Sequence, residues 1–337
     1  MQWKMHAFLG SILAAIGATL LASHHAPGTQ AGLDSYRRPL VIPYPADNPY
    51  SGEKSELGRA LFFDPILSGS GSRSCGTCHN PALAWGDGAA LATGEVRLAL
   101  RSPTLLDVAW TSRLGWDGKF QDLEAVAFGP ITSPTNMNLP EKALIERLQM
   151  IPGYVEAFAA TFGSSGISRR NVELALATFE RSIVSGRAPF DRWMEGDAKA
   201  ISTSANRGFD LFKGKARCSG CHNGFSFTDG SFHDIGTAKD ADIGRGRLFP
   251  SSVKLRYAFK TPTLRDVGRR APYMHDGSIA TLEEVIDLYD RGGIERPSRS
   301  VLIRPLGLTD SEKQDLIAFL GTLDAAPQKV VLPNLPR

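Results

Sequence analysis

The sequence predicts a mainly α-helical protein built from two copies of one unit, with long loops between the helices. Three observations support this: similar blocks recur in both halves, capping signals precede apolar helical repeats, and no window alternates apolar and polar residues as a half-buried strand would. The 337 residues allow two ordinary domains, and 42% hydrophobic with 22% charged residues is a globular composition. The small net charge of +3 gives no case for nucleic acid or an anionic membrane surface.

The first residues have the features of a secretory signal peptide, which we expect to span residues 1–26. Lys4 supplies a positive start, the stretch from Ala7 to Ala22 is uncharged and apolar, and small residues follow. This stretch is short for a membrane span, although an uncleaved anchor remains an alternative. The segment from Arg38 to Tyr50 is rich in proline and is expected to be irregular.

An internal repeat predicts an N-terminal domain at 27–200 and a C-terminal domain at 201–337. The spacing between the matching blocks is the same in both halves, without a gap. The matches are Ser102–Val108 with Thr261–Val267, Trp116–Gly118 with His275–Gly277, and Leu123–Glu124 with Leu282–Glu283.

Helix-capping signals place several helices around these blocks. The stretch from Leu139 to Met194 is expected to be helical, with Ser168 capping one of its helices. Capping boxes at Thr281 and Thr309 are expected to open a short helix that includes Tyr289 and the last helix of the chain.

All four cysteines belong to two C-x-x-C-H motifs, Cys75–His79 and Cys218–His222. In such a motif two thiols, here Cys75 with Cys78 and Cys218 with Cys221, attach a haem, and the histidine ligates its iron. A zinc site or a disulfide pair would leave the adjacent histidines unexplained. The sequence therefore predicts two covalently bound haem c groups, with His79 and His222 as proximal ligands, in cytochrome c-like haem domains. Because c-type haem is attached outside the cytoplasm, we expect a periplasmic protein.

The remaining histidines and methionines limit the sixth ligand of each iron. Outside the signal segment and the two motifs, only His233 and His275 remain, and both lie in the second half. A second histidine from its own half is therefore excluded for the first haem. The methionine candidates are Met137, Met150, Met194 and Met274.

From about Asn48 to Leu323 the chain resembles the bacterial dihaem cytochrome c peroxidases, including their MauG-type branch. The resemblance rests on both haem motifs, the Ser-Pro-Thr-Leu and Trp-Asp-Gly blocks, Gly129–Ile131 and Ala271–Ser278. It implies a haem-peroxidase-type oxidoreductase in which hydrogen peroxide forms high-valent iron and a partner protein is oxidised by long-range electron transfer. Modification of tryptophan or tyrosine residues on that partner is one expected outcome.

The resemblance also implies a different distal side for each haem. Tyr289 lies fourteen residues after His275, where peroxidases have a ligating methionine and the MauG-type branch has tyrosine. Met274 is the alternative ligand. The counterpart fourteen residues after Trp116 is Pro130, which cannot ligate iron, so the first haem is expected to be open to peroxide. The resemblance places Trp116 between the haems as an electron relay; the alternative is a buried core tryptophan.

Among the positions that depart from the family pattern, two bear on the haem sites. Asn136 replaces a distal glutamate, and an asparagine can hydrogen-bond peroxide but cannot move its proton at neutral pH. Arg101 replaces an asparagine that often binds an interhaem calcium together with the carbonyls at Arg270 and Pro272. Calcium binding therefore stays open, and the positive charge of Arg101 argues against it.

Two other functions remain as alternatives. A cytochrome c peroxidase would reduce hydrogen peroxide with electrons from a small cytochrome or cupredoxin, but Tyr289 and Asn136 count against it. A non-enzymatic dihaem electron carrier would not need the open site that Pro130 implies. The expected partners are hydrogen peroxide and a periplasmic protein substrate or electron donor. Neither nucleic acid nor a membrane beyond the signal segment is expected.

Overall fold

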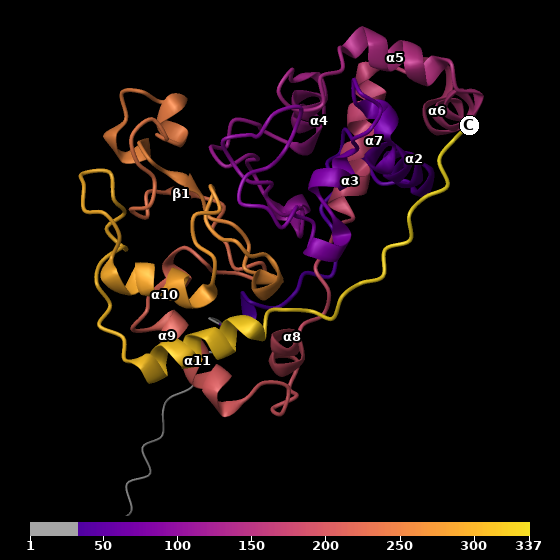
Figure 1. Cartoon of the computed structure of the whole chain (residues 1–337). Helices are drawn as coiled ribbons and strands as arrows, with labels where there is room; N and C mark the ends of the chain where they lie inside the picture. The colour runs from indigo at the N-terminus through magenta and orange to yellow at the C-terminus, as the bar shows by residue number, and fades with distance from the viewer. Residues whose placement is uncertain (1–32) are drawn as a thin grey trace, which may run out of the picture.

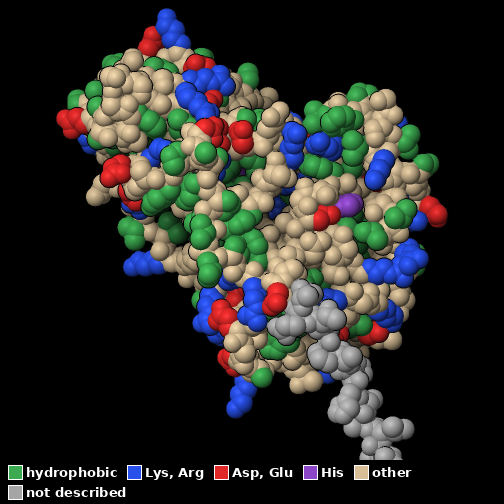
Figure 2. All heavy atoms as spheres, turned by 180° about the vertical axis from the view of Figure 1, so that it is seen from behind, with side chains coloured by type: hydrophobic (Ala, Val, Ile, Leu, Met, Phe, Trp, Pro, Cys, Tyr) green, Lys and Arg blue, Asp and Glu red, His purple; other side chains and the backbone are tan. Residues whose placement is uncertain are grey.

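The computed structural model describes residues 33–337 and shows two lobes side by side (Figure 1). The predicted signal peptide lies outside these residues. Among the described residues, none of the helices is both long and apolar enough to cross a membrane. On the face seen in Figure 2, acidic and basic side chains are interspersed, as the small net charge leads one to expect.

The described residues are mainly helical, which confirms the predicted fold class. The two strands, β1 (Phe232–His233) and β2 (Phe259–Lys260), form one short antiparallel pair. The α-helices are α2 (Gly52–Phe63), α3 (Cys75–Cys78), α4 (Leu123–Thr132), α5 (Glu141–Gln149), α6 (Pro152–Phe162), α7 (Arg169–Arg181), α8 (Pro189–Met194), α9 (Thr203–Lys213), α10 (Leu282–Arg291) and α11 (Asp310–Gly321). Ser168, Thr281 and Thr309 cap α7, α10 and α11, as the sequence predicts.

Each lobe is built on one crossing of two helices, α2 with α7 and α9 with α11. A side-chain carbon at Gly58 of α2 would lie 2.0 Å from the carbonyl oxygen of Ala175 in α7. In the same way, a carbon at Gly208 of α9 would lie 1.9 Å from the carbonyl oxygen of Asp315 in α11. Only glycine permits such an approach, so the two crossings are copies of one another. We call α2–α7 the N-terminal unit and α8–α11 the C-terminal unit.

Helices α4 and α10 are also counterparts. They have the same length, and Pro130 and Tyr289 are the eighth residue of each. Arg181 of α7 holds α4 through two hydrogen bonds to Glu124, of 2.7 and 2.8 Å, and both side chains are buried. The structure therefore places the two predicted distal positions at matching points of the repeat.

Segments from one end of the chain pack on the other unit. Tyr36, which precedes α2 in the chain, lies in the core of the C-terminal unit. The C-terminal tail, yellow in Figure 1, runs back to the N-terminal unit, where the Arg337 carbonyl accepts a hydrogen bond of 2.9 Å from the Gly153 backbone N–H. These exchanges tie the two units together, and the domain boundary near residue 200 stays a prediction.

Candidate functional site

The two motif histidines have the hydrogen bonding that an iron ligand needs. Nδ1 of His79 lies 3.2 Å from the Trp85 carbonyl, and Nδ1 of His222 lies 2.9 Å from the Phe227 carbonyl. Donation from Nδ1 leaves Nε2 as the metal-binding nitrogen. Burial lowers the pKa of both histidines, which favours the neutral imidazole that binds metal.

A cavity lined by both units brings together the predicted haem residues of the C-terminal half. Its walls include Cys218, Cys221, His222 and Tyr289, with Leu320 among the apolar residues that complete it. Burial raises the pKa of Tyr289, so its phenol would lose a proton only to a strong positive charge such as a metal ion. Met274 lines the same cavity, so the choice between these two ligands stays a prediction.

Cationic side chains that line this cavity suit the two carboxylates of a haem. Arg101, Arg270 and Lys260 border the cavity, and none of them forms an ion pair with another described residue. Burial lowers the pKa of Arg270 to about 10 and that of Lys260 to about 8. Unpaired buried cations are costly, and a bound anionic group would relieve that cost.

The remaining methionine candidates lie elsewhere. Met150 is 82% exposed, whereas Met137 and Met194 pack in the cores of the N-terminal and C-terminal units.

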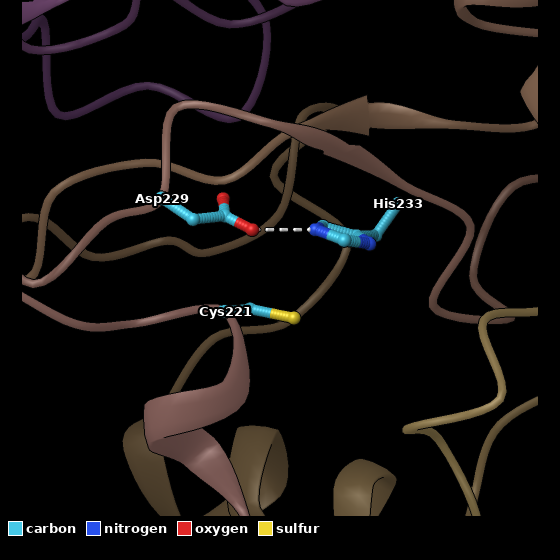
Figure 3. A group of neighbouring side chains, drawn as sticks. All are labelled: Cys221, Asp229 and His233. Atoms are coloured by element: carbon cyan, nitrogen blue, oxygen red, sulfur yellow. Dashed lines mark hydrogen bonds and ion pairs between the residues drawn. The ribbon is translucent and has the colours of Figure 1, made fainter.

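A close group is formed by the side chains of Cys221, Asp229 and His233 (Figure 3). Two of them, Cys221 and His233, line the cavity. The ligand atoms of all three residues lie within 4.8 Å of one another, and Nε2 of His233 lies 2.8 Å from a carboxylate oxygen of Asp229. This hydrogen bond, with a second to Cys221, raises the pKa of His233 to about 10. Because Cys221 belongs to a haem motif, we interpret the group as a charged pair beside the haem, not as a metal site. His233 enters the sequence analysis only as one of the two remaining histidines and is not paired there with Asp229.

The two predicted distal residues of the N-terminal unit lie near the end of α4: Pro130 is inside the helix and Asn136 follows it. The Pro130 carbonyl accepts a hydrogen bond of 3.1 Å from the Met137 backbone N–H, so the chain folds back on the end of α4. Asn136 lies in this turn, half-buried, and its carbonyl accepts a 2.9 Å hydrogen bond from the Glu95 backbone N–H. The structure thus brings Asn136 near Pro130, and the roles of both residues stay predictions.

Trp116 lies at the contact between the two units. Its indole N–H donates to the Arg101 carbonyl at 2.9 Å, and its own carbonyl accepts a 2.9 Å hydrogen bond from the Lys260 backbone N–H. The indole ring meets the ring of His275 edge-on, with 6.4 Å between their centres. Trp116 also lines the cavity that contains the predicted haem residues of the C-terminal unit, together with other residues of its own unit. This position beside the cavity, at the contact between the units, suits the predicted electron relay.

Residues of the C-terminal unit hold the loop that carries Trp116. Arg245 donates to the Asp117 carbonyl at 2.6 Å. Gly118 has φ +71°, and a side-chain carbon there would lie 2.1 Å from the ring of Phe232 in β1. Only glycine fits this contact, which explains the last residue of the Trp-Asp-Gly block.

Arg101 does not fit the role of a calcium ligand. Its side chain is buried, and its guanidinium donates at 3.0 Å to the Arg270 carbonyl, one of the oxygens that the resemblance assigns to calcium. Its backbone N–H donates to the His275 carbonyl at 3.0 Å. Calcium binds oxygen ligands and is repelled by a cation bound to the same carbonyl. Arg101 itself therefore supplies a positive charge between the units.

We expect calcium chelation to leave the ferric EPR spectrum and the melting temperature of the protein unchanged. The Arg101→Asn variant restores an oxygen ligand and removes the competing cation, so it is expected to bind calcium and become sensitive to chelation. Elemental analysis of both proteins after dialysis against a chelator measures the difference. Stoichiometric calcium retained by the unmutated protein would contradict the expectation.

Comparison with known proteins gives consistent matches. A family model described as di-haem cytochrome c peroxidase matches residues 52–199. The methylamine utilization protein MauG of Methylorubrum extorquens is 52% identical over 89% of this chain and 86% of that protein. The MauG of Methylophilus methylotrophus is 47% identical over 90% of this chain and 92% of that protein. The crystal structure of a MauG-like protein associated with microbial copper homeostasis is 31% identical, with a TM-score of 0.79 over 85% of this chain and 94% of that chain.

Proposed function

The chain belongs to the di-haem cytochrome c peroxidase family, and we propose that it is a periplasmic oxidoreductase that uses hydrogen peroxide to oxidise a partner protein. The two similar proteins named MauG support this assignment within the family. The C-x-x-C-H motifs support covalent attachment of both haems and a location outside the cytoplasm.

When bound, the haems supply the reaction with peroxide and the storage of oxidising equivalents. The residues of the chain would hold both haems and give each a different distal side. His79 and His222 each keep Nε2 available for iron. At matching points of α4 and α10, Pro130 offers no ligand atom, whereas Tyr289 offers a phenol oxygen beside the cavity. This contrast carries the proposal, because it leaves one unit open to a small molecule and closes the other.

At the open site, Asn136 replaces the distal glutamate that moves the proton of peroxide in the family. The amide of Asn136 can orient peroxide by hydrogen bonding, while water or another acid supplies the proton. Trp116 forms hydrogen bonds with residues of both units, so it is positioned to carry an electron between them.

Reduction of peroxide with a small cytochrome or cupredoxin is the second candidate function. Both MauG relatives are named methylamine utilization proteins, and tyrosine at position 289 agrees with that branch. A hard oxygen donor favours ferric and higher iron over ferrous iron, so it suits oxidation of a partner better than rapid electron intake.

Mass spectrometry of co-expressed neighbouring gene products tests the proposal. With this protein and hydrogen peroxide present, a partner is expected to gain oxygen atoms or lose hydrogen atoms at tryptophan or tyrosine residues. The control omits this protein or adds catalase. Unchanged partner masses, together with rapid peroxide turnover on reduced cytochrome c, would support the second candidate instead.

A further inference from the structure

The repeat shows which residue of α7 faces the N-terminal haem. The crossing glycines pair Ala175 with Asp315, and five residues further along each helix lie Glu180 of α7 and Leu320 of α11. Leu320 lines the cavity that contains the haem residues of the C-terminal unit. Glu180 therefore occupies, in the N-terminal unit, the position of an apolar wall residue of a haem cavity.

Glu180 is buried without a partner. The residue is only 8% exposed, and its side chain makes no hydrogen bond or ion pair with any described residue. The neighbouring Arg181 does not neutralise it, because that guanidinium is bound by two hydrogen bonds to Glu124. A buried carboxyl without a partner is costly, so such a position calls for a functional reason.

The charge of Glu180 acts at the haem attachment site. Glu180 is the neighbour whose charge contributes most, after burial, to raising the pKa of Cys75. The other charged groups around Glu180 are Glu124 on α4 and Arg181 on its own helix, with Lys54 of α2 close to that pair. Burial raises the pKa of Glu180 to about 8, Glu124 adds to the shift, and Arg181 opposes it.

We propose that Glu180 is the proton-exchanging group of the N-terminal haem site: when the iron there gains one electron, Glu180 takes up one proton from solvent, and it returns that proton when the electron leaves. The electron comes from the partner protein or from an added chemical reductant, and the carboxylate becomes the neutral acid. The proton keeps the charge of the buried site nearly constant, which lowers the cost of changing the iron's oxidation state in a low dielectric. The inference rests on the proposed function. It assigns to Glu180 an influence on the reduction potential of the N-terminal haem, in a site that lacks the family's distal glutamate.

Redox titration of the purified dihaem protein between about pH 6 and pH 10 tests the proposal, since this range brackets the protonation of a carboxyl with a strongly raised pKa. The reduction potential of the N-terminal haem is expected to fall as pH rises, because ionised Glu180 stabilises ferric iron. Glu180→Gln should remove most of this dependence, as should Glu180→Leu, which copies the C-terminal unit. The proposal would be overturned if a Glu180 variant that carries both haems showed the same pH dependence of the reduction potential as the unmutated protein. It would also be overturned if the potential of the unmutated protein did not depend on pH.

An infrared difference spectrum keeps the test independent of whether either variant folds. Reduction of the unmutated protein near pH 8 is expected to produce the carbonyl band of a protonated carboxylic acid, and its absence would overturn the proposal. Both measurements need only the bound haems. A failure of partner oxidation would therefore refute the proposed function and leave the role of Glu180 to be judged separately.

Discussion

Replacing Tyr289 with phenylalanine is expected to abolish the low-spin ferric EPR signal and leave both haems high-spin. The unmutated protein should show one signal of each kind, because Pro130 provides no ligand at the point where α10 provides Tyr289. The substitution keeps the ring that lines the cavity and removes only the oxygen atom. The effect is therefore expected on ligation, with little change in packing.

Met274 supplies the matched control, because it lines the same cavity. Met274→Leu conserves volume and is expected to keep the low-spin signal. If Met274→Leu lost that signal and Tyr289→Phe kept it, the ligand would be Met274. Two low-spin signals in the unmutated protein would contradict an open N-terminal site.

Replacing Trp116 with phenylalanine is expected to slow partner oxidation by about tenfold or more, equivalent to about 1.4 kcal/mol in the barrier. Phenylalanine is harder to oxidise than the indole and cannot donate to the Arg101 carbonyl. Leaving that buried acceptor without its donor should also cost about 1–3 kcal/mol of stability. Single-turnover rates with peroxide and partner measure the first effect, and denaturant unfolding measures the second.

Trp110 provides a comparison for this experiment. It packs edge-on against Phe225, with 4.9 Å between ring centres. Trp110→Phe keeps this aromatic contact and is expected to leave the rate of partner oxidation close to that of the unmutated protein. Equal losses in both variants would show that Trp116 has no special role, as would normal rates in a folded Trp116→Phe protein.

The local features of this protein could be predicted from its sequence. Ser168, Thr281 and Thr309 begin their helices as expected, because a cap depends on residues within one turn of it. The constant spacing of the repeat is enough to align Pro130 with Tyr289, since helices of equal length preserve equal positions.

Contacts between distant segments could not be predicted in this way. Nothing near Arg101 in the sequence indicates that its guanidinium binds the Arg270 carbonyl, and nothing near Tyr36 indicates that it packs in the C-terminal unit. From the neighbouring sequence, Glu180 is expected to be an ordinary polar residue of an amphipathic helix. Its burial follows from the packing of other helices, including α2 and α4, on α7.

The sequence by itself determined that two haems are bound, that the two units are copies, and that they diverged at Pro130 and Tyr289. Only the tertiary structure decided that Trp116 borders the cavity lined by Cys218, Cys221 and His222, that the Arg101 guanidinium binds the Arg270 carbonyl, and that Glu180 is buried. The physical reason is range: motifs and caps act within a few residues, whereas burial and charge pairing depend on which surfaces the folded chain brings together.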